Sequence, residues 1–220
     1  MLNNLKERLF FHALINNITK RRKEEDIVFK VAQSQEEKEG AYRLRYKVFC
    51  KEWGYLPLSK YPSGQEYDEY DTISSTIIAI KPNTNQVIGT IRVIKETSGR
   101  PLPLERYSPI STYGDQLTVF GELSRLTVDK KYRSKYDVAF GLIKSSILFS
   151  RKIGITDFCI SVAVDRAERY SRFGFSKVGE QYQYQDIAYP RKSITLIANI
   201  EDNLKKMKHQ YPEFYKFFSS

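Results

Sequence analysis

Cysteine, histidine and tryptophan are scarce in this chain, whose 220 residues include only two Cys, two His and one Trp. Cys50 and Cys159 lie far apart, and His12 and His209 lie near opposite termini, so no CxxC pair and no metal-ligand spacing is present. We therefore expect no metal site. The small number of cysteines fits a reducing compartment such as the cytoplasm.

Long apolar runs are also missing from the sequence. No stretch approaches the roughly 20 apolar residues that a membrane-spanning helix needs. The first 23 residues carry charges inside their apolar stretch and lack a small-residue cleavage site, so they do not resemble a secretory signal. Residues 3–19 are predicted to form an amphipathic helix, followed by a basic run at 20–23. We favour a packed terminal extension over residues 1–25, with contact to an anionic membrane surface as the alternative.

Charge is the most unusual bulk property of the chain, which has a formal net charge of +10. A basic surface favours a polyanionic partner, such as nucleic acid, anionic lipid or an acidic carrier protein, although many soluble basic proteins have no such partner. The sequence contains no helix-turn-helix, zinc-finger or RNP string, and its Lys and Arg residues are spread along the chain. We therefore do not expect nucleic-acid binding.

Hydrophobic periodicity predicts an α/β fold with a mixed sheet and helices on both of its faces. Ser34 and Glu37 form a predicted capping box at the start of the first helix of the main domain. Residues 26–200 form this domain, and residues 201–220 form a terminal amphipathic helix that Pro212 interrupts. The predicted strands cover residues 27–32, 75–81, 87–95, 117–128, 155–164, 176–184 and 192–199, the predicted helices cover 34–53, 137–151 and 165–172, and loops cover 56–72 and 98–115.

Several short motifs follow one another between residues 45 and 125. In chain order they are Arg45 with Phe49, Tyr55, Asp68 with Asp71, Gly89 with Arg92, and Glu122 with Arg125. This ordered set resembles the signature of acyl-homoserine-lactone (autoinducer) synthases and of long-chain N-acyl amino acid synthases. Residues 170–175 and 178–180 resemble the end of GNAT acyltransferase domains in general. The resemblance covers about residues 27–200 and implies a GNAT fold and an N-acyltransferase activity.

Two departures from these families bear on the substrates. Autoinducer synthases have a Trp where this chain has Tyr55, and that Trp belongs to the S-adenosylmethionine side of their site. Acyl-CoA-dependent GNAT enzymes have a glycine-rich loop before their central helix, where backbone N–H groups bind pyrophosphate. Here the glycine spacing is lost, and four cations take its place: Lys130, Lys131, Arg133 and Lys135. We interpret them as a basic patch for the phosphopantetheine phosphate of an acidic acyl-carrier protein, with a solvated loop as the alternative.

Amide formation from a thioester needs a neutral amine, a stabilised oxyanion and a protonated leaving thiolate. The predicted base is Glu122, unless it forms an ion pair with Arg125, which would require a bulge at Gly121. Without that bulge, Arg125 would pair with Asp68 or Asp71. The backbone N–H groups of Leu126, Thr127 and Val128 are candidates for the oxyanion hole. By resemblance Tyr170 protonates the thiolate, with a core aromatic as the alternative.

The remaining charged motif residues suggest how the acceptor binds. By resemblance, Arg45, Asp68, Asp71 and Arg92 form a network around an amino-acid acceptor, with its carboxylate on Arg and its ammonium on Asp. The alternative is a structural latch that holds the loop 56–72. Phe49 would form a wall of the acyl or acceptor pocket, or belong to the core.

The sequence thus favours transfer of a fatty acyl group from acyl-carrier protein to the amine of an amino acid, without a tightly bound cofactor. The alternatives are an autoinducer synthase that uses S-adenosylmethionine and an acyl-CoA-dependent N-acetyltransferase.

Overall fold

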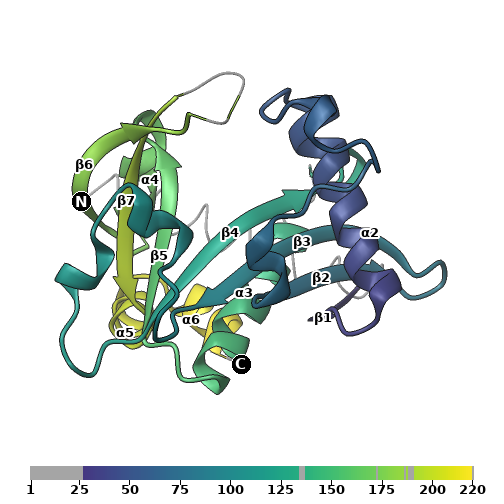
Figure 1. Ribbon diagram of the computed structural model, residues 1–220. Coiled ribbons are helices and arrows are strands. Elements are labelled where there is room, and N and C mark those ends of the chain that lie inside the picture. Colours follow the sequence, from purple (N-terminus) through teal and green to yellow (C-terminus); the bar gives the residue numbers. More distant parts are fainter. Residues whose placement is uncertain (1–26, 134–136, 172, 186, 188–190, 220) are drawn as a thin grey trace.

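One seven-stranded sheet organises the chain (Figure 1). The computed structural model describes residues 27–133, 137–171, 173–185, 187 and 191–219, so the helix predicted over residues 3–19 lies outside the described residues. The strand order is β1-β2-β3-β4-β5-β7-β6, and all neighbours are antiparallel except β4 and β5, which are parallel. The strands are β1 (Val28–Val31), β2 (Ser75–Lys81), β3 (Gln86–Lys95), β4 (Phe120–Val128), β5 (Asp157–Ala163), β6 (Ser176–Gln183) and β7 (Lys192–Asn199). Each predicted strand is confirmed, with small shifts at its ends.

Helices pack on both faces of this sheet, as the hydrophobic pattern predicted. On β2, Ile78 and Ile80 pack with Ala41 of α2 (Gln35–Tyr46), whereas Ile77 and Ala79 belong to the core cluster under α3 (Asp137–Lys152). Both faces of β2 are thus apolar because each is covered by a helix. The capping box that starts α2 is confirmed, since the Glu37 N–H donates to Ser34 Oγ and the Glu37 carboxylate accepts from the Ser34 N–H.

The end of the first helix differs from the prediction. After Tyr46 the chain continues as one wide π-helical turn, Lys47–Glu52, in which the Trp53 N–H bonds to the carbonyl of Val48. Val48 and Cys50 are buried, whereas Trp53 is 40% exposed. The apolar spacing of a single turn does not distinguish the π form from the α form, so this widening has no counterpart in the sequence pattern.

A wedge opens between the two halves of the sheet. β4 pairs with β5 only from Phe120 to Glu122, and beyond Glu122 the two strands separate. A bulge is present in β4, but at Arg125 and not at Gly121, where the sequence would have permitted one: the β3–β4 register shifts at Arg125, which has φ 56°. Gly121 is needed for a different reason, because a Cβ at that position would come within 2.6 Å of the Ile155 side chain.

The predicted loops carry short 3-10 helices, at Leu58–Lys60 and Glu69–Thr72 in one loop and at Pro103–Arg106 and Ile110–Tyr113 in the other. After β5 a turn leads into α4 (Ala167–Ser171), and the chain ends with α5 (Ile200–Gln210) and α6 (Pro212–Ser219), which meet at the predicted break. Phe214, Phe217 and Phe218 of α6 are buried in the core cluster that contains α3. Among the described residues, no helix is long and apolar enough to cross a membrane.

Gly89 on β3 tests how tightly α3 is packed on the sheet. A Cβ at this position would lie 2.7 Å from Val138 and 2.9 Å from Leu142, both fully buried on α3. We expect Gly89→Ala to lower the free energy of unfolding by about 1–3 kcal/mol through overpacking. Urea denaturation would measure this, with Ser59→Ala at an exposed position as control. Equal stability of the two variants would show that the helix–strand contact is looser than described.

Candidate active site

A cluster of three arginines and three carboxylates lies between α2, the loop 56–72, β3 and β4. Arg45 is fully buried, donates through Nη1 and Nη2 to Asp71 at 2.7 and 2.9 Å, and donates through Nε to Glu66. The guanidinium of Arg92, with the side chain 1% exposed, bonds to Asp68 at 2.6 Å and to Asp71 at 3.2 Å. Arg125 is the third arginine of the cluster. The three arginines and the three carboxylates, Glu66, Asp68 and Asp71, together have no net charge.

Arg125 connects the β4 bulge to the same cluster. Its guanidinium donates to Glu66 at 3.1 Å and to Asp68 at 3.0 Å. The predicted alternative of an Arg125–Asp68 pair is therefore observed, whereas no contact joins Arg125 to Glu122 among the described hydrogen bonds. Burial by itself would raise the pKa of Glu66, Asp68 and Asp71, but the neighbouring guanidinium groups outweigh it and lower each pKa. All three carboxylates are thus held in the ionised form.

Arg45 and Arg92 are two of the predicted acceptor-binding residues. For both, the geometry of the cluster favours the structural alternative, in which they hold the loop 56–72, over direct contact with the acceptor. Arg45 and Arg92 are buried, and internal carboxylates and Ser124 occupy their donors. The side chains of Arg125 and Asp68, by contrast, are 28% and 22% exposed. Asp68 also accepts a bond from the Tyr70 N–H and so caps the short helix that ends the loop.

Glu66 was missed by the sequence analysis. It lies in a polar loop, where most acidic residues are exposed, and nothing in its immediate sequence distinguishes a buried carboxylate from a solvated one. Its side chain is nevertheless 0% exposed and bonds to two arginines from different elements. Its own N–H donates to the carbonyl of Tyr42 on α2, which fixes the loop against the helix.

Glu122 lies close to this cluster but in a different environment. It is 4% exposed, and its neighbours in register are Ile94 on β3 and Cys159 on β5, both of which belong to an apolar core cluster. Its carboxylate accepts a hydrogen bond from the Leu104 N–H at 2.9 Å. Burial raises the pKa of Glu122 to about 7, against the smaller opposing effects of that bond and of Arg92 and Arg125. A carboxylate with this pKa can both accept and release a proton near neutrality.

Among the described residues, no strand pairs with the wedge-facing edge of β4 beyond Glu122. The Asp129 N–H bonds to Ile88 on the β3 side, so alternation along the strand directs the Val128 N–H to the opposite, open edge. The Val128 carbonyl accepts from Arg133 Nε at 2.7 Å, as expected for a group at that edge. By the same alternation the Thr127 N–H points to β3. Leu126 adjoins the bulge at Arg125, where the alternation is interrupted, so Val128 is the predicted oxyanion donor whose direction the register supports.

Aromatic rings form one side of the site next to the bulge. The Phe49 and Trp53 ring centroids are 5.5 Å apart, and those of Trp53 and Tyr55 are 5.4 Å apart. The guanidinium of Arg125 lies 5.9 Å from the Phe49 ring. The chain therefore has an indole beside Tyr55 although its Trp stands two positions earlier, which weakens the argument against S-adenosylmethionine drawn from Tyr55.

The predicted donor patch is only partly free to bind a phosphate. Arg133 donates to Glu52 at 2.5 Å and lies 5.3 Å from the Trp53 ring, so its charge is already matched. Lys130 and Lys131 are exposed. Lys135 lies outside the described residues, and the patch in the described part of the chain therefore consists of two lysines.

The opposite side of the wedge carries hydroxyl groups that the sequence analysis did not predict. Tyr182 on β6 donates to Ser161 on β5 at 2.7 Å and accepts from Thr195 on β7 at 3.3 Å. The Tyr107 ring stacks on Tyr182 at 4.8 Å, and Tyr184 packs against both, with its pKa raised by burial. These residues come from four separate segments, so no local pattern could have indicated their association.

Tyr170 lies in a mainly apolar environment. Its ring packs edge-on against Phe175 at 6.0 Å and joins the cluster that contains Ile160 and Val162 on β5. The core contact that we considered as the alternative is thus present. The role of the hydroxyl in protonating the thiolate stays a prediction.

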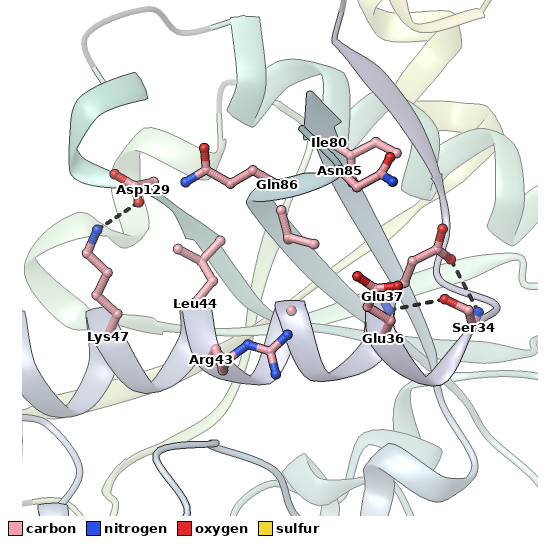
Figure 2. Close-up of a pocket in the computed structure, with 12 residues that line it drawn as sticks. Ser34, Glu36, Glu37, Arg43, Leu44, Lys47, Ile80, Asn85, Gln86 and Asp129 are labelled. Carbon is pink, nitrogen blue, oxygen red and sulfur yellow. Dashed lines mark hydrogen bonds and ion pairs between the residues drawn. The ribbon is translucent and has the colours of Figure 1, made fainter. Parts of the chain in front are cut away.

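A separate groove of about 380 Å³ lies between α2 and the β2–β3 turn (Figure 2). Figure 2 shows Lys47 and Asp129 at one end, joined by an ion pair of 2.8 Å, and Ser34 with Glu37 at the other. Neither Glu122 nor any member of the arginine–carboxylate cluster lines this groove. We therefore place the candidate active site in the wedge and not here.

Comparisons with known proteins identify the family to which the chain belongs. The family model of N-acyl amino acid synthase FeeM matches residues 40–196. A search of curated proteins gave no match. Among solved structures, FeeM, an N-acyl amino acid synthase from uncultured soil microbes, superposes with a TM-score of 0.65 at 16% identity, covering 82% of this chain and 94% of that one.

Two further structures extend the likeness. BjaI, a CoA-dependent acyl-homoserine lactone synthase with SAM and isopentyl-CoA, gives a TM-score of 0.61 at 18% identity, covering 80% of this chain and 82% of that one. A GNAT-family acetyltransferase from Staphylococcus aureus Mu50 gives 0.52 at 15% identity, covering 79% and 99%. The GNAT fold expected from the sequence is thereby confirmed. With a family match that spans the whole wedge and its charged cluster, the chain belongs to the FeeM family of N-acyl amino acid synthases and is an N-acyltransferase.

Proposed function

We propose that this enzyme transfers a fatty acyl group from the phosphopantetheine thioester of an acyl-carrier protein to the amine of an amino acid. The observation that supports this most directly is Glu122, a buried carboxylate with a pKa of about 7 beside the unpaired edge of β4. A base with this pKa suits an amine that must lose a proton near neutral pH.

The proposed reaction uses groups from both sides of the wedge. Glu122 takes a proton from the acceptor ammonium, directly or through water, and the neutral amine attacks the thioester carbonyl. The Val128 N–H stabilises the oxyanion. Collapse of the intermediate breaks the C–S bond, forms the amide and releases the thiolate, which Tyr170 protonates. The second amine proton leaves to solvent, Glu122 also releases its proton to solvent, and Tyr170 regains one from solvent, so the enzyme returns to its starting state and no external redox reagent is needed.

The acceptor would bind at the exposed part of the charged cluster. An amino acid carries a carboxylate and an ammonium, which match the partly exposed Arg125 and Asp68. Arg45, Arg92 and Asp71 then position these two side chains rather than contact the acceptor. Phe49 and Tyr55 would form the adjacent apolar wall.

Acyl-carrier protein is the proposed donor because exposed Lys130 and Lys131 stand where CoA-dependent GNAT enzymes have a glycine-rich loop. An autoinducer synthase remains a second candidate, because the indole of Trp53 adjoins Tyr55 and BjaI has a similar fold. Incubating the purified enzyme with acyl-carrier protein and either free amino acids or S-adenosylmethionine, followed by mass spectrometry of the products, tests both. An N-acyl amino acid supports the proposal, whereas an acyl-homoserine lactone replaces it with the second candidate.

Glu122→Gln keeps the size of the side chain and removes its basicity. We expect the chemical step to slow by about 10²–10⁴-fold with little change in donor affinity. The wild-type kcat/KM should rise with pH through an apparent pKa of about 7, because the deprotonated form is the active one, and this limb should vanish in the variant. Single-turnover rates between pH 5.5 and 8.5 would measure both effects. A variant with a normal rate at pH 7 would remove Glu122 from this role.

Arg125→Ala tests the proposed acceptor contact. Losing a charge-assisted bond to the acceptor carboxylate should raise KM for a free amino acid about 10–100-fold, whereas KM for the corresponding amino acid amide should change little. Arg125→Lys, which keeps the charge, is the matched control, and thermal melting would show that each variant is folded. An equal increase for acid and amide would assign Arg125 to the scaffold alone.

A further inference from the structure

Arg133 contacts the backbone of Val128, the residue whose N–H is the proposed oxyanion donor. Its Nε donates to the Val128 carbonyl at 2.7 Å. In an extended strand the N–H and the carbonyl of one residue point to the same side, so both groups of Val128 lie at the open edge of β4. Without a cation bound to it, this carbonyl would present its negative end next to the position where the oxyanion forms. Arg133 therefore binds a backbone group that would otherwise oppose the reaction.

The π-helical turn at the end of α2 holds the rest of the Arg133 side chain. Nη2 of Arg133 donates to Glu52 at 2.5 Å, and the guanidinium lies 5.3 Å from the centre of the Trp53 ring. The planar guanidinium is thus bonded at both Nε and Nη2, which fixes its direction as well as its position. Its charge already serves a carboxylate and a backbone carbonyl of the protein, which leaves it poorly suited to bind an incoming phosphate.

The turn that leads from β4 to Arg133 is fixed in its own right. The Asp129 carboxylate accepts from the Lys131 N–H at 3.0 Å and so caps the 3-10 helix Lys130–Tyr132. The same carboxylate pairs with Lys47 of the π-helical turn at 2.8 Å, and Figure 1 shows the end of β4 beside the C-terminal part of α2. A side chain supported by such contacts can hold a reacting group in one geometry.

We propose that Arg133 is a positioning residue for the oxyanion site and not a ligand of the donor phosphate. By binding the Val128 carbonyl, it fixes the direction of the Val128 N–H and offsets the carbonyl dipole that would repel the oxyanion. Glu52 and Trp53 act through Arg133, which gives the π-helical turn a part in the chemistry. The inference rests on the proposed function and deepens it, because it replaces the phosphate-binding role that the sequence suggested for Arg133.

Donors with and without a phosphate separate the two roles of Arg133. Acyl-phosphopantetheine contains the phosphate and acyl-pantetheine lacks it, whereas both present the same thioester carbonyl. We expect Arg133→Leu to lower kcat about 10–100-fold with both donors, less than the 10²–10³-fold that loss of an oxyanion donor itself costs, because the Val128 N–H remains. KM for both donors should change little. A phosphate ligand would instead raise KM for acyl-phosphopantetheine alone and leave kcat as it is.

Glu52→Gln tests the support of Arg133 without changing Arg133 or Val128. This variant should lower kcat in the same way but by less, and it should have no further effect when it is combined with Arg133→Leu. Arg151→Leu is the matched control, because it removes an arginine from another ion pair, with Glu201 at 2.7 Å, in the last turn of α3. It should keep the wild-type kcat. Thermal melting of each variant shows whether it is folded, and Glu52→Gln alone decides the matter if Arg133→Leu does not fold.

Three results would overturn the inference. KM for acyl-phosphopantetheine could rise in Arg133→Leu while acyl-pantetheine is used normally, which would make Arg133 a phosphate ligand. The value of kcat could equal that of Arg151→Leu with both donors, or the effects of Glu52→Gln and Arg133→Leu could simply add. Failure of the proposed function is recognised separately, in the products of the wild-type enzyme. An acyl-homoserine lactone there would change the acceptor but leave the comparison of kcat values valid, because the same thioester carbonyl is attacked.

Discussion

The buried contact between three arginines and three carboxylates is the interaction on which the rest of the site depends. Arg45, Arg92 and Arg125 come from α2, β3 and β4, whereas Glu66, Asp68 and Asp71 come from one loop. Removing one member would leave a buried charge unmatched, which typically costs about 3–5 kcal/mol. Arg125 also has φ 56°, a backbone conformation that is unfavourable for a residue with a side chain. Its bonds to Glu66 and Asp68 hold it there, so the bulge that directs the β4 N–H groups depends on the loop.

The contrast between Glu122 and the carboxylates of this cluster shows how one small region supports two functions. Glu66 and Glu122 are both almost fully buried, and desolvation is the largest influence on the pKa of each. Glu66 receives bonds from two guanidinium groups, so its pKa falls, whereas Glu122 receives one backbone N–H and its pKa rises. Placement of the guanidinium groups therefore separates the structural acids from the candidate base. The short bulge at Arg125 contributes directly, because it turns this guanidinium toward Glu66 and Asp68.

Much of the fold followed from local sequence patterns, whereas the site followed from them only in part. The capping box of Ser34 and Glu37, the apolar strands and the break at Pro212 each depend on neighbouring residues, and all were predicted correctly. The bulge at Arg125 has no counterpart in the sequence pattern, and Gly121, which would permit a bulge, instead packs against Ile155, a contact between distant segments. Glu66 and the hydroxyl group of Tyr182 were missed for a related reason: their partners are brought together only by the assembled sheet. The motif residues at 45, 68, 71, 92 and 125 did meet in space, but burial divides them into supporting and accessible groups.

The distribution of charge gives these observations a common physical basis. In the charged cluster, which is buried except for parts of Arg125 and Asp68, six ionised groups sum to zero, because a net charge in a medium of low dielectric constant would be very unfavourable. At the entrance of the wedge the cations outnumber the carboxylates. Water solvates the excess cations, so their free-energy cost is small, and their electric field extends over about a Debye length. The balanced charges of the cluster hold its side chains in a fixed arrangement. The unbalanced charges at the surface attract negatively charged molecules. The net charge of +10 therefore matters less than its location, since part of it, on Lys130 and Lys131, lies directly after the end of β4.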